Sequence, residues 1–358
     1  MLATVPFATL SSSGAPSVVV PELLAHVPGS RTMYLVDLVG CEDVSCLRLF
    51  RTSVSTTSFP AVTLPPLSRV SGSLTGDLDR LVFATANVGY ALVGTSFPWT
   101  MYKTVDGART WQRVKIASGK SIVGLTVSAP SIYTVTALCS SIGDNCRDYQ
   151  VNHSTLNAQG WTSTAMPHPS KTQVGDGDFN PNVGAFGSNV WISEITHAGS
   201  TIFTSYDGGK TFAPIAANKL ASVSGCAIMA ASARSLWAEC PTGMMVSFFH
   251  SSDGGATWSN ISRYEFAGTG GGWFDPVSTT LGYLAYGQQQ PFDRITNAGA
   301  TITNLDKLAC AKYSSLTDLS FSDETHGLVL CSPDGTWASE QLLKTSDGGV
   351  HWIHVPAN

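Results

Sequence analysis

Short apolar runs separated by turn residues recur along the whole chain. Between positions 81 and 114 these runs are Leu81-Val-Phe-Ala-Thr, Gly89-Tyr-Ala-Leu-Val, Thr100-Met-Tyr-Lys-Thr and Trp111-Gln-Arg-Val. Runs of this length, bounded by Gly, Ser and Asp, are typical of β-strands. The pattern therefore predicts a unit of four short strands in this stretch.

An eight-residue motif, S-x-D-x-G-x-T-[WF], indicates that this unit is repeated. Two copies match the motif at every fixed position and two come close: Ser205–Phe212, Ser251–Trp258, Thr104–Trp111 and Thr345–Trp352. Three degenerate copies run from Thr52 to Phe59, from Ser154 to Trp161 and from Ile295 to Ile302. The seven copies end 52, 50, 51, 46, 44 and 50 residues apart, at Phe59, Trp111, Trp161, Phe212, Trp258, Ile302 and Trp352.

A large residue, aromatic in six of the seven units, precedes each motif end by 19 to 28 residues, at Tyr34, Tyr90, Tyr133, Trp191, Trp237, Tyr283 and Leu328. Four-stranded units of about 40 to 50 residues repeated radially are the signature of a β-propeller. The sequence therefore predicts an all-β protein, a seven-bladed β-propeller with four-stranded antiparallel blades. It also predicts that residues 1–358 form one domain, although the length alone indicates two or three.

We expect the motif to form the turn between the third and fourth strands of a blade. Its Asp carboxylate accepts backbone N–H groups of the turn, and its glycines supply the positive φ of a tight reversal. Its last Trp or Phe begins the outer strand and packs between neighbouring sheets. The aspartates of the four clearest copies are therefore predicted to be structural and not catalytic: Asp106, Asp207, Asp253 and Asp347.

These motifs resemble Asp-box (BNR) repeats, which occur in sialidases, sortilin-type receptors, xyloglucanase-type glycoside hydrolases and photosystem II stability/assembly factors. An aromatic start to strand two followed by K-T-x-D-G-G, as in Lys344–Gly349, is most similar to the last family and its bacterial relatives. The resemblance covers the whole chain. It implies blades joined by structural turns, with ligands at the mouth of the central channel opposite those turns, and it implies no particular reaction.

The charge and hydropathy patterns count against a nucleic acid partner and against a membrane span. Lys and Arg number 20 and Asp and Glu 25, a net charge of −5 with no basic block, so we expect no nucleic acid partner. No run of 18 or more apolar residues occurs, so we expect no membrane span. Residues 1–17 lack a charged segment followed by an apolar one, and we interpret them as a mature or trimmed N-terminus.

The eight cysteines fall in pairs, each within one predicted blade. Because adjacent strands of a blade bring Cα atoms to bridging distance, we predict the disulfides Cys41–Cys46, Cys139–Cys146, Cys226–Cys240 and Cys310–Cys331. Such bridges form in oxidising compartments, so we expect a secreted or cell-surface protein. Eight buried, reduced cysteines are the alternative. No C-x-x-C occurs and no His lies at ligand spacing from a Cys, so neither a metal nor a cofactor is predicted.

Loops on the face opposite the motif turns carry the groups from which a site is built. Exposed Trp side chains stack on flat apolar faces and amides bind hydroxyls, which is the chemistry of sugar recognition. The candidate ligand-binding residues are Trp99, Trp273, Gln289 and Trp337. The candidate catalytic carboxylates are Asp178, Glu194, Glu265, Asp275 and Glu340. The alternative is that each Trp packs under a long loop and each acid is solvated.

Two functions are compatible with these residues. A monomeric binding or scaffold module for a glycan or protein partner needs only a rigid propeller with variable loops, and we favour it. The alternative is a glycoside hydrolase, which needs two carboxylates about 5 to 9.5 Å apart across the sugar. Xyloglucanase-type enzymes carry two propellers where this chain has one. A sialidase is disfavoured because Phe50-Arg51-Thr-Ser lacks the proline of the F/Y-R-x-P motif. A photosystem assembly role is disfavoured because no basic patch is visible.

Overall fold

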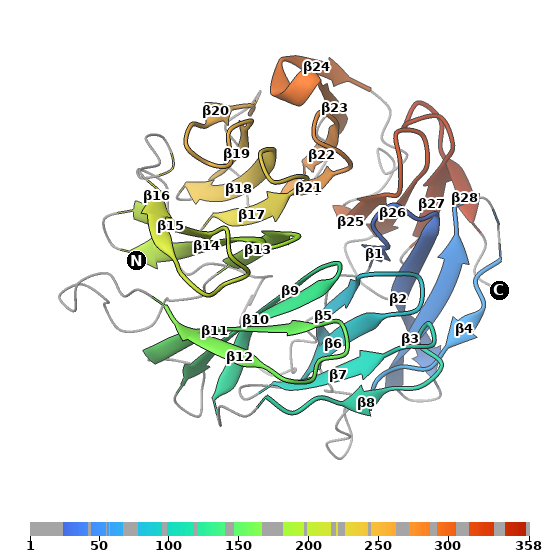
Figure 1. The fold of residues 1–358 in the computed structure, drawn as a ribbon. Helices are drawn as coiled ribbons and strands as arrows, with labels where there is room; N and C mark the ends of the chain where they lie inside the picture. The colour runs from blue at the N-terminus through green and yellow to red at the C-terminus, as the bar shows by residue number, and fades with distance from the viewer. Residues whose placement is uncertain are drawn as a thin grey trace, which may run out of the picture.

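The computed structural model describes residues 24–41, 44–54, 56, 58–66, 78–94, 99–116, 120–139, 147–166, 182–196, 199–215, 220, 226–242, 245–262, 272–286, 292–305, 315–332 and 341–355. Within these residues, twenty-eight strands form seven four-stranded antiparallel sheets. The sheets stand around a common centre, and the chain passes round the ring blade by blade (Figure 1). The predicted all-β, seven-bladed β-propeller is therefore confirmed.

Each blade is built from four strands that follow one another in the chain. Blade 1 comprises β1 (Leu24–His26), β2 (Thr32–Cys41), β3 (Val44–Ser53) and β4 (Ala61–Val62). Blade 2 comprises β5 (Leu78–Phe83), β6 (Gly89–Val93), β7 (Thr100–Thr104) and β8 (Gln112–Arg113). Blade 3 comprises β9 (Ser121–Ser128), β10 (Ser131–Leu138), β11 (Arg147–Thr155) and β12 (Thr162–Ala165). In blade 2, β6 and β7 have the bounds predicted from the sequence.

The second half of the ring follows the same plan. Blade 4 comprises β13 (Asn182–Phe186), β14 (Asn189–Thr196), β15 (Gly199–Ser205) and β16 (Ala213–Ile215). Blade 5 comprises β17 (Ala227–Ala230), β18 (Leu236–Thr242), β19 (Met245–Ser251) and β20 (Ser259–Asn260). Blade 6 comprises β21 (Gly272–Pro276), β22 (Gly282–Tyr286), β23 (Phe292–Thr296) and β24 (Thr301–Asn304), with the short 3-10 helix η2 (Asn297–Gly299) before β24. Blade 7 comprises β25 (Ser315–Phe321), β26 (Gly327–Ser332), β27 (Gln341–Thr345) and β28 (Ile353–Val355).

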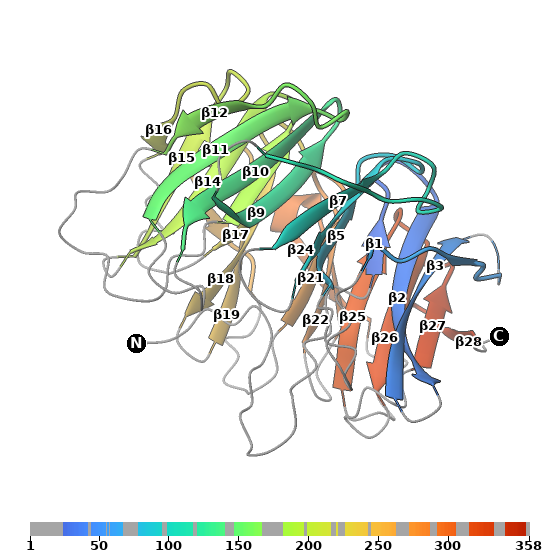
Figure 2. The ribbon, with the colours of Figure 1, turned by 90° about the horizontal axis from the view of Figure 1, so that it is seen from below.

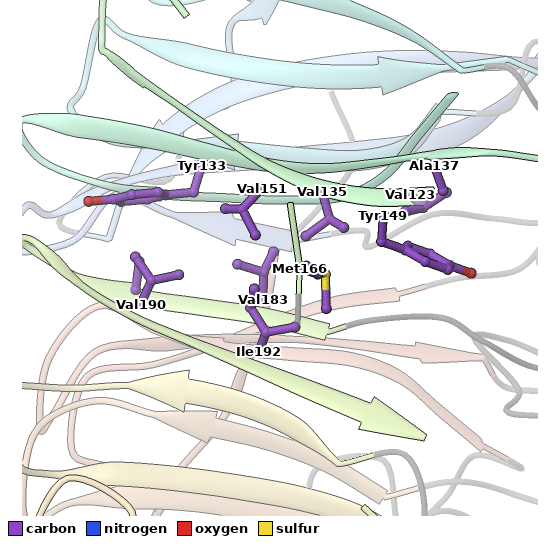
Figure 3. Packing of buried hydrophobic residues seen from close by; sticks show 11 residues of the cluster. Val123, Tyr133, Val135, Ala137, Tyr149, Val151, Met166, Val183, Val190 and Ile192 are labelled. Carbon is purple, nitrogen blue, oxygen red and sulfur yellow. The ribbon is translucent and has the colours of Figure 1, made fainter. Parts of the chain in front are cut away.

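Buried apolar side chains gather between the blades rather than in one central core. The described residues form seven such clusters, one at each interface between neighbouring blades. Figure 3 shows the cluster between blades 3 and 4, where Tyr133, Val135 and Val151 face Val190 and Ile192. Because each blade is apolar on both faces, its second strand can be buried along its whole length, as the apolar run of β6 is.

The two sequence markers meet at every interface. The strand-two marker of one blade and the last motif residue of the next blade join the same cluster, as Tyr133 and Phe212 do between blades 3 and 4. The other pairs are Tyr34 with Trp111, Tyr90 with Trp161, Trp191 with Trp258, Trp237 with Ile302, Tyr283 with Trp352, and Leu328 with Phe59. The motif end therefore packs between neighbouring sheets, as the sequence predicts.

A hydrogen bond accompanies the strand-two marker at six interfaces, and we call it the clasp. The hydroxyl or indole N–H donates to a turn carbonyl of the next blade, so the polar tip of the buried ring finds a partner. The clasps are Tyr34 to Ala86 (2.9 Å), Tyr90 to Leu156 (2.5 Å), Tyr133 to Gly187 (2.9 Å), Trp191 to Gly254 (3.0 Å), Trp237 to Ser278 (3.0 Å) and Tyr283 to Glu324 (2.6 Å). In the seventh unit, Leu328 has no polar side-chain atom to donate.

One of the predicted disulfides is described at both ends. Cys226 and Cys240 are joined, with their Cα atoms 4.1 Å apart and both side chains buried. Cys139 and Cys331 each belong to a further disulfide. The partners predicted for these two, and the side chains of the pair Cys41–Cys46, lie outside the described residues. The alternative of eight reduced cysteines is wrong.

Candidate binding face

The two faces of the ring are built from different connections. The turns between strands one and two and between strands three and four lie at one end of each blade, which we call the Asp-turn face. The connections between strands two and three, and from one blade to the next, belong to the opposite end, which we call the mouth face. Figure 2 shows the blades from the side, with both ends in view. The sequence analysis expects every candidate site residue on the mouth face.

Asp106 shows how the motif folds on the Asp-turn face. Its Oδ1 accepts the backbone N–H groups of Arg109 (3.0 Å) and Thr110 (2.9 Å), and its Oδ2 accepts the Thr110 hydroxyl (2.6 Å). The Thr104 hydroxyl donates to Asp106 Oδ1 (2.9 Å) and accepts the N–H of Ala108 (2.9 Å). The hydroxyl and backbone donors of Thr110 lower the pKa of Asp106 to about 2. Both oxygens of this carboxylate therefore already accept hydrogen bonds from donors of its own turn.

Asp207, Asp253 and Asp347 are held by the same pattern of hydrogen bonds. In the last of these turns, His351 replaces the threonine, and its Nδ1 lies 2.6 Å from Oδ2 of Asp347. Burial raises the pKa of Asp253 and Asp347, but the donors of the turn outweigh it and hold both below their ordinary value. The four Asp turns thus use their carboxylates as structural acceptors.

Glycine completes the Asp turn. Gly208, which follows Asp207, adopts a φ of +78°, a region that residues with a Cβ rarely occupy. Its N–H donates to the carbonyl of Ser188 at 2.9 Å, in the turn between strands one and two of the same blade. The two turns of a blade are therefore joined to each other, and the Asp-turn face is fastened by main-chain hydrogen bonds.

Asp275 is a candidate carboxylate whose side chain is described, and its predicted position in a mouth-face loop is wrong. It lies in β21 beside the turn that leads to β22, and it is 7% exposed. Its Oδ2 accepts the backbone N–H of Phe321 in β25. Burial raises the pKa of Asp275, while His26 and the Phe321 N–H act to lower it. The strand begins at Gly272, three residues before this carboxylate, so Asp275 belongs to a strand and not to the loop.

The remaining candidate carboxylates are not brought together by the described part of the chain. Glu194 lies in β14 and pairs with Thr201 of β15, near the mouth-face end of both strands. Its side chain lies outside the described residues. So do Asp178, Glu265 and Glu340, together with the binding candidates Gln289 and Trp337.

Trp99 and Trp273 stand at mouth-face ends of strands and are partly buried. Trp99 precedes β7 and packs against the cluster between blades 2 and 3. Trp273 is the second residue of β21 and packs against the cluster between blades 6 and 7. Both rings are therefore partly core residues, and each keeps an accessible part at the mouth.

Sequence reasoning missed a set of polar side chains that tie one blade to the next. They stand on the first strand of a blade, as Asp275 does, and reach the main chain of the following blade. The ties are Arg80 to the Leu125 carbonyl (3.2 Å), Ser128 to the Gly187 N–H (2.8 Å), Asn182 to the Ile228 N–H (3.2 Å) and Asp318 to the Leu24 N–H (2.6 Å). Each is a polar residue on a first strand that also carries buried apolar side chains, and this mixture is the signal that would have found them.

Glu239 is a second residue that sequence reasoning missed. It lies in β18, two positions after Trp237. The same position is apolar in five other blades, where it is occupied by Val36, Leu92, Val135, Ala285 and Leu330. Burial raises the pKa of Glu239 to about 7. A comparison of the repeats position by position would have marked this carboxyl group as exceptional.

The described residues include no candidate for a metal site or a membrane-spanning helix. No group of three or more His, Cys, Asp or Glu side chains in this part of the chain is placed to hold a metal ion. No helix among these residues has both the length and the apolar character that crossing a membrane requires.

The strands and the ties between blades define a seven-bladed β-propeller, and comparison with known proteins places it among other propellers. No family model matches the chain, and no curated protein matches its sequence. YCF48 bound to D1 peptide is similar in structure, with a TM-score of 0.55, 14% identity, and coverage of 91% of this chain and 94% of that one.

Two enzymes have comparable structures. A catalytically inactive virginiamycin B lyase from Staphylococcus aureus with quinupristin has a TM-score of 0.56 and 9% identity, over 91% of this chain and 94% of that one. A puromycin hydrolase mutant complexed with PGG has a TM-score of 0.61 and 12% identity, over 94% of this chain and 53% of that one. At these identities the likeness shows the fold alone.

Proposed function

We propose that this chain is a binding module that holds a peptide segment of a partner protein at the mouth face of its propeller. The observation that carries the proposal is that polar side chains on the first strands of the blades, the inner strands, are hydrogen-bonded to the next blade. Asn182, Asp275 and Asp318 are bonded to main-chain N–H groups of the next blade. The bonds of Asn182 and Asp275 hold the inner strands of blades 4 and 5 and of blades 6 and 7 in register, so these parts of the mouth present a preorganised surface. A preorganised surface loses little conformational entropy on binding.

Two observations support a peptide as the partner. The partly buried rings of Trp99 and Trp273 provide apolar anchors at the mouth-face ends of two blades, and aromatic anchors dominate the energetics of protein interfaces. The similar propeller YCF48, which matches over nearly the whole of both chains, is described with a bound peptide. A glycan is the other partner compatible with these rings.

The binding test compares a peptide array with a glycan array, using labelled protein. We expect peptides to bind, and we expect Trp273→Ala to weaken the strongest of them by about tenfold or more. Tyr206→Ala is the matched control, because Tyr206 is 63% exposed on the Asp-turn face. Circular dichroism melts of both variants establish that they fold. Binding to glycans alone would replace the peptide partner with a carbohydrate.

A panel of chromogenic glycosides tests the hydrolase alternative on the same preparation. We expect no turnover, because the candidate carboxylate Asp275 is buried and committed to the Phe321 N–H. The proposal would be contradicted by turnover that is lost in Asp178→Asn, Glu265→Gln or Glu340→Gln. Such a result would establish a glycoside hydrolase.

We also propose that the Asp turns are Asp-box repeats and that the protein is secreted or displayed at the cell surface. The four turns share one pattern of hydrogen bonds, which supports the first part. The disulfide Cys226–Cys240 supports the second, because disulfides persist in oxidising compartments. Thiol titration of freshly isolated protein under denaturing conditions is expected to find no free thiol. Eight free thiols would contradict export.

A further inference from the structure

Blades 7 and 1 meet where the ring closes (Figure 1). The strands of blade 7 all lie within residues 315–355 and those of blade 1 within residues 24–62, so the described strands are not exchanged between the two blades. At the other six interfaces the chain itself passes from one blade to the next. Among the described residues, the contact between blades 7 and 1, which we call the seam, is therefore made without a strand shared by the two blades.

The seam also lacks the clasp. At the interface of blades 6 and 7, Tyr283 donates to the carbonyl of Glu324 and stacks on Phe321 with ring centroids 3.6 Å apart. At the seam the corresponding position holds Leu328, which does neither. The buried members of the seam cluster are all aliphatic or thioether side chains, namely Leu24, Met33, Leu35, Val54, Leu328 and Leu330.

The residue that precedes the strand-two marker differs as well. Blades 2, 6 and 7 have glycine there, and a Cβ on Gly89, Gly282 or Gly327 would collide with a Phe ring of the same blade. Blade 1 has Met33 at this position, and it is fully buried in the seam cluster. A flexible side chain thus fills a gap that a Phe ring fills at the interfaces of blades 1 and 2, 5 and 6, and 6 and 7. Methionine packing specifies a single arrangement poorly.

Three polar contacts across the seam join described residues. The Leu24 N–H donates to Asp318 Oδ2 at 2.6 Å, and Lys344 Nζ donates to the Thr56 carbonyl at 2.9 Å. The third, between Ser320 Oγ and His26 Nδ1, is 3.4 Å long, near the limit for a hydrogen bond. In the part of the chain that the structure describes, these contacts and the seam cluster hold the two blades together.

We propose that the propeller opens at the seam. The interface between blades 7 and 1 parts before the other six, and the channel then widens between β1 and β25 while the rest of the ring keeps its contacts. The fold thereby contains a joint, placed where the repeated aromatic clasp is replaced by Leu328.

Three backbone amides report on this joint, because each donates to a side chain of the preceding blade. Leu24 donates across the seam, Ile228 across the interface of blades 4 and 5, and Phe321 across that of blades 6 and 7. Amide hydrogen exchange follows local opening. By NMR on the full chain we expect Leu24 to exchange about tenfold or more faster than the other two. Equal protection of the three amides would overturn the proposal.

A pair of variants separates opening of the seam from fraying of β1. Leu328→Tyr supplies a hydroxyl to reach the turn of blade 1, and Leu328→Phe supplies the ring without it. We expect the Leu24 amide to exchange about two- to tenfold more slowly in Leu328→Tyr than in Leu328→Phe, which is the range that one hydrogen bond gives. The exchange of the Ile228 amide should be the same in both variants. Tyr283→Phe should instead speed exchange at Phe321 and spare Leu24. Identical Leu24 rates in the Tyr and Phe variants would show that β1 merely frays.

Discussion

The two faces of the propeller are held by different chemistry, most clearly in blade 5, which has both an Asp turn and a described disulfide. At the Asp-turn face, a carboxylate, two hydroxyls and the intervening backbone close the turn within one motif, as around Asp106. At the mouth face, the disulfide Cys226–Cys240 joins the residue before β17 to strand β18. Cys41, Cys46, Cys139 and Cys331 also stand at or beside mouth-face ends of strands.

This difference teaches how a repeat protein separates scaffold from binding surface. The donors and acceptors of an Asp turn lie within eight residues, so each repeat can encode its own turn. Loops that recognise a ligand have to differ from blade to blade, and their ends cannot rely on a repeated hydrogen-bond pattern. A disulfide needs only two residues, whatever the loop between them contains.

Acid is expected to have the largest effect, because it acts on all the Asp turns at once. The pKa values of Asp106 and Asp347 are lowered to about 2. A carboxyl group with a depressed folded-state pKa stabilises the fold above its unfolded pKa, and this stabilisation is lost as the pH falls through the folded value. We expect Tm, measured by calorimetry, to fall most steeply between about pH 4 and pH 2.

Burial raises the pKa of Glu239 and Asp275, so these two groups respond to acid with the opposite sign. Their protonation favours the folded state, and it begins at higher pH than that of the Asp turns. A Tm that stays level down to pH 2 would show that the Asp turns do not hold that end of the blades.

Removing one disulfide should have the next largest effect, and it acts on the mouth end alone. The double variant Cys226→Ala/Cys240→Ala frees a loop with a sequence separation of 14, and losing a loop closure of this size costs about 3 kcal/mol. The measurement is guanidinium unfolding, with Tm as a second readout. Reductant should destabilise the wild-type protein further, because Cys139 and Cys331 are bonded too. An unchanged midpoint would mean that the loop is held by other contacts.

A single Asp turn should contribute less than the disulfide. In Asp253→Ala, the Thr257 N–H and hydroxyl and the Ser251 hydroxyl lose their acceptor, at a cost of about 1 to 3 kcal/mol. Glu324→Ala is the matched control on the same face, because its side chain is exposed and its ion pair with Arg294 is 3.8 Å long, which is worth at most about 1 kcal/mol. Equal midpoints for the two variants in urea would contradict the structural role of Asp253.

The smallest effect is expected at a clasp. Tyr133→Phe keeps the buried ring and removes the hydroxyl that donates to Gly187 at 2.9 Å, which should cost about 0.5 to 1.5 kcal/mol. Tyr206→Phe is the control, because its ring is mainly exposed. A variant as stable as the control would show that packing alone joins blades 3 and 4.

The ring was predictable from sequence because its determinants recur every 44 to 52 residues. Tyr90 and Trp111 mark a strand and a turn in one blade, and the same pair of markers recurs in the next. Asp275 was misplaced for the opposite reason: its partner, the Phe321 N–H, is 46 residues away in another blade. Nothing local to Gly272–Pro276 distinguishes a strand with a buried carboxylate from a loop.

The pairing of the two markers has a consequence for how such a chain grows. Each repeat presents its strand-two residue on one side and its motif end on the other, so every interface is head-to-tail, like the contact between identical subunits of a cyclic oligomer. Phe212 meets Tyr133 of the unit before it, while Trp191 of the same unit meets Trp258 of the unit after. A duplicated unit inserted between two others would find a complementary neighbour on each side. The number of blades is therefore a property of the angle at which the ring closes, and gene duplication can change it without creating a new kind of contact.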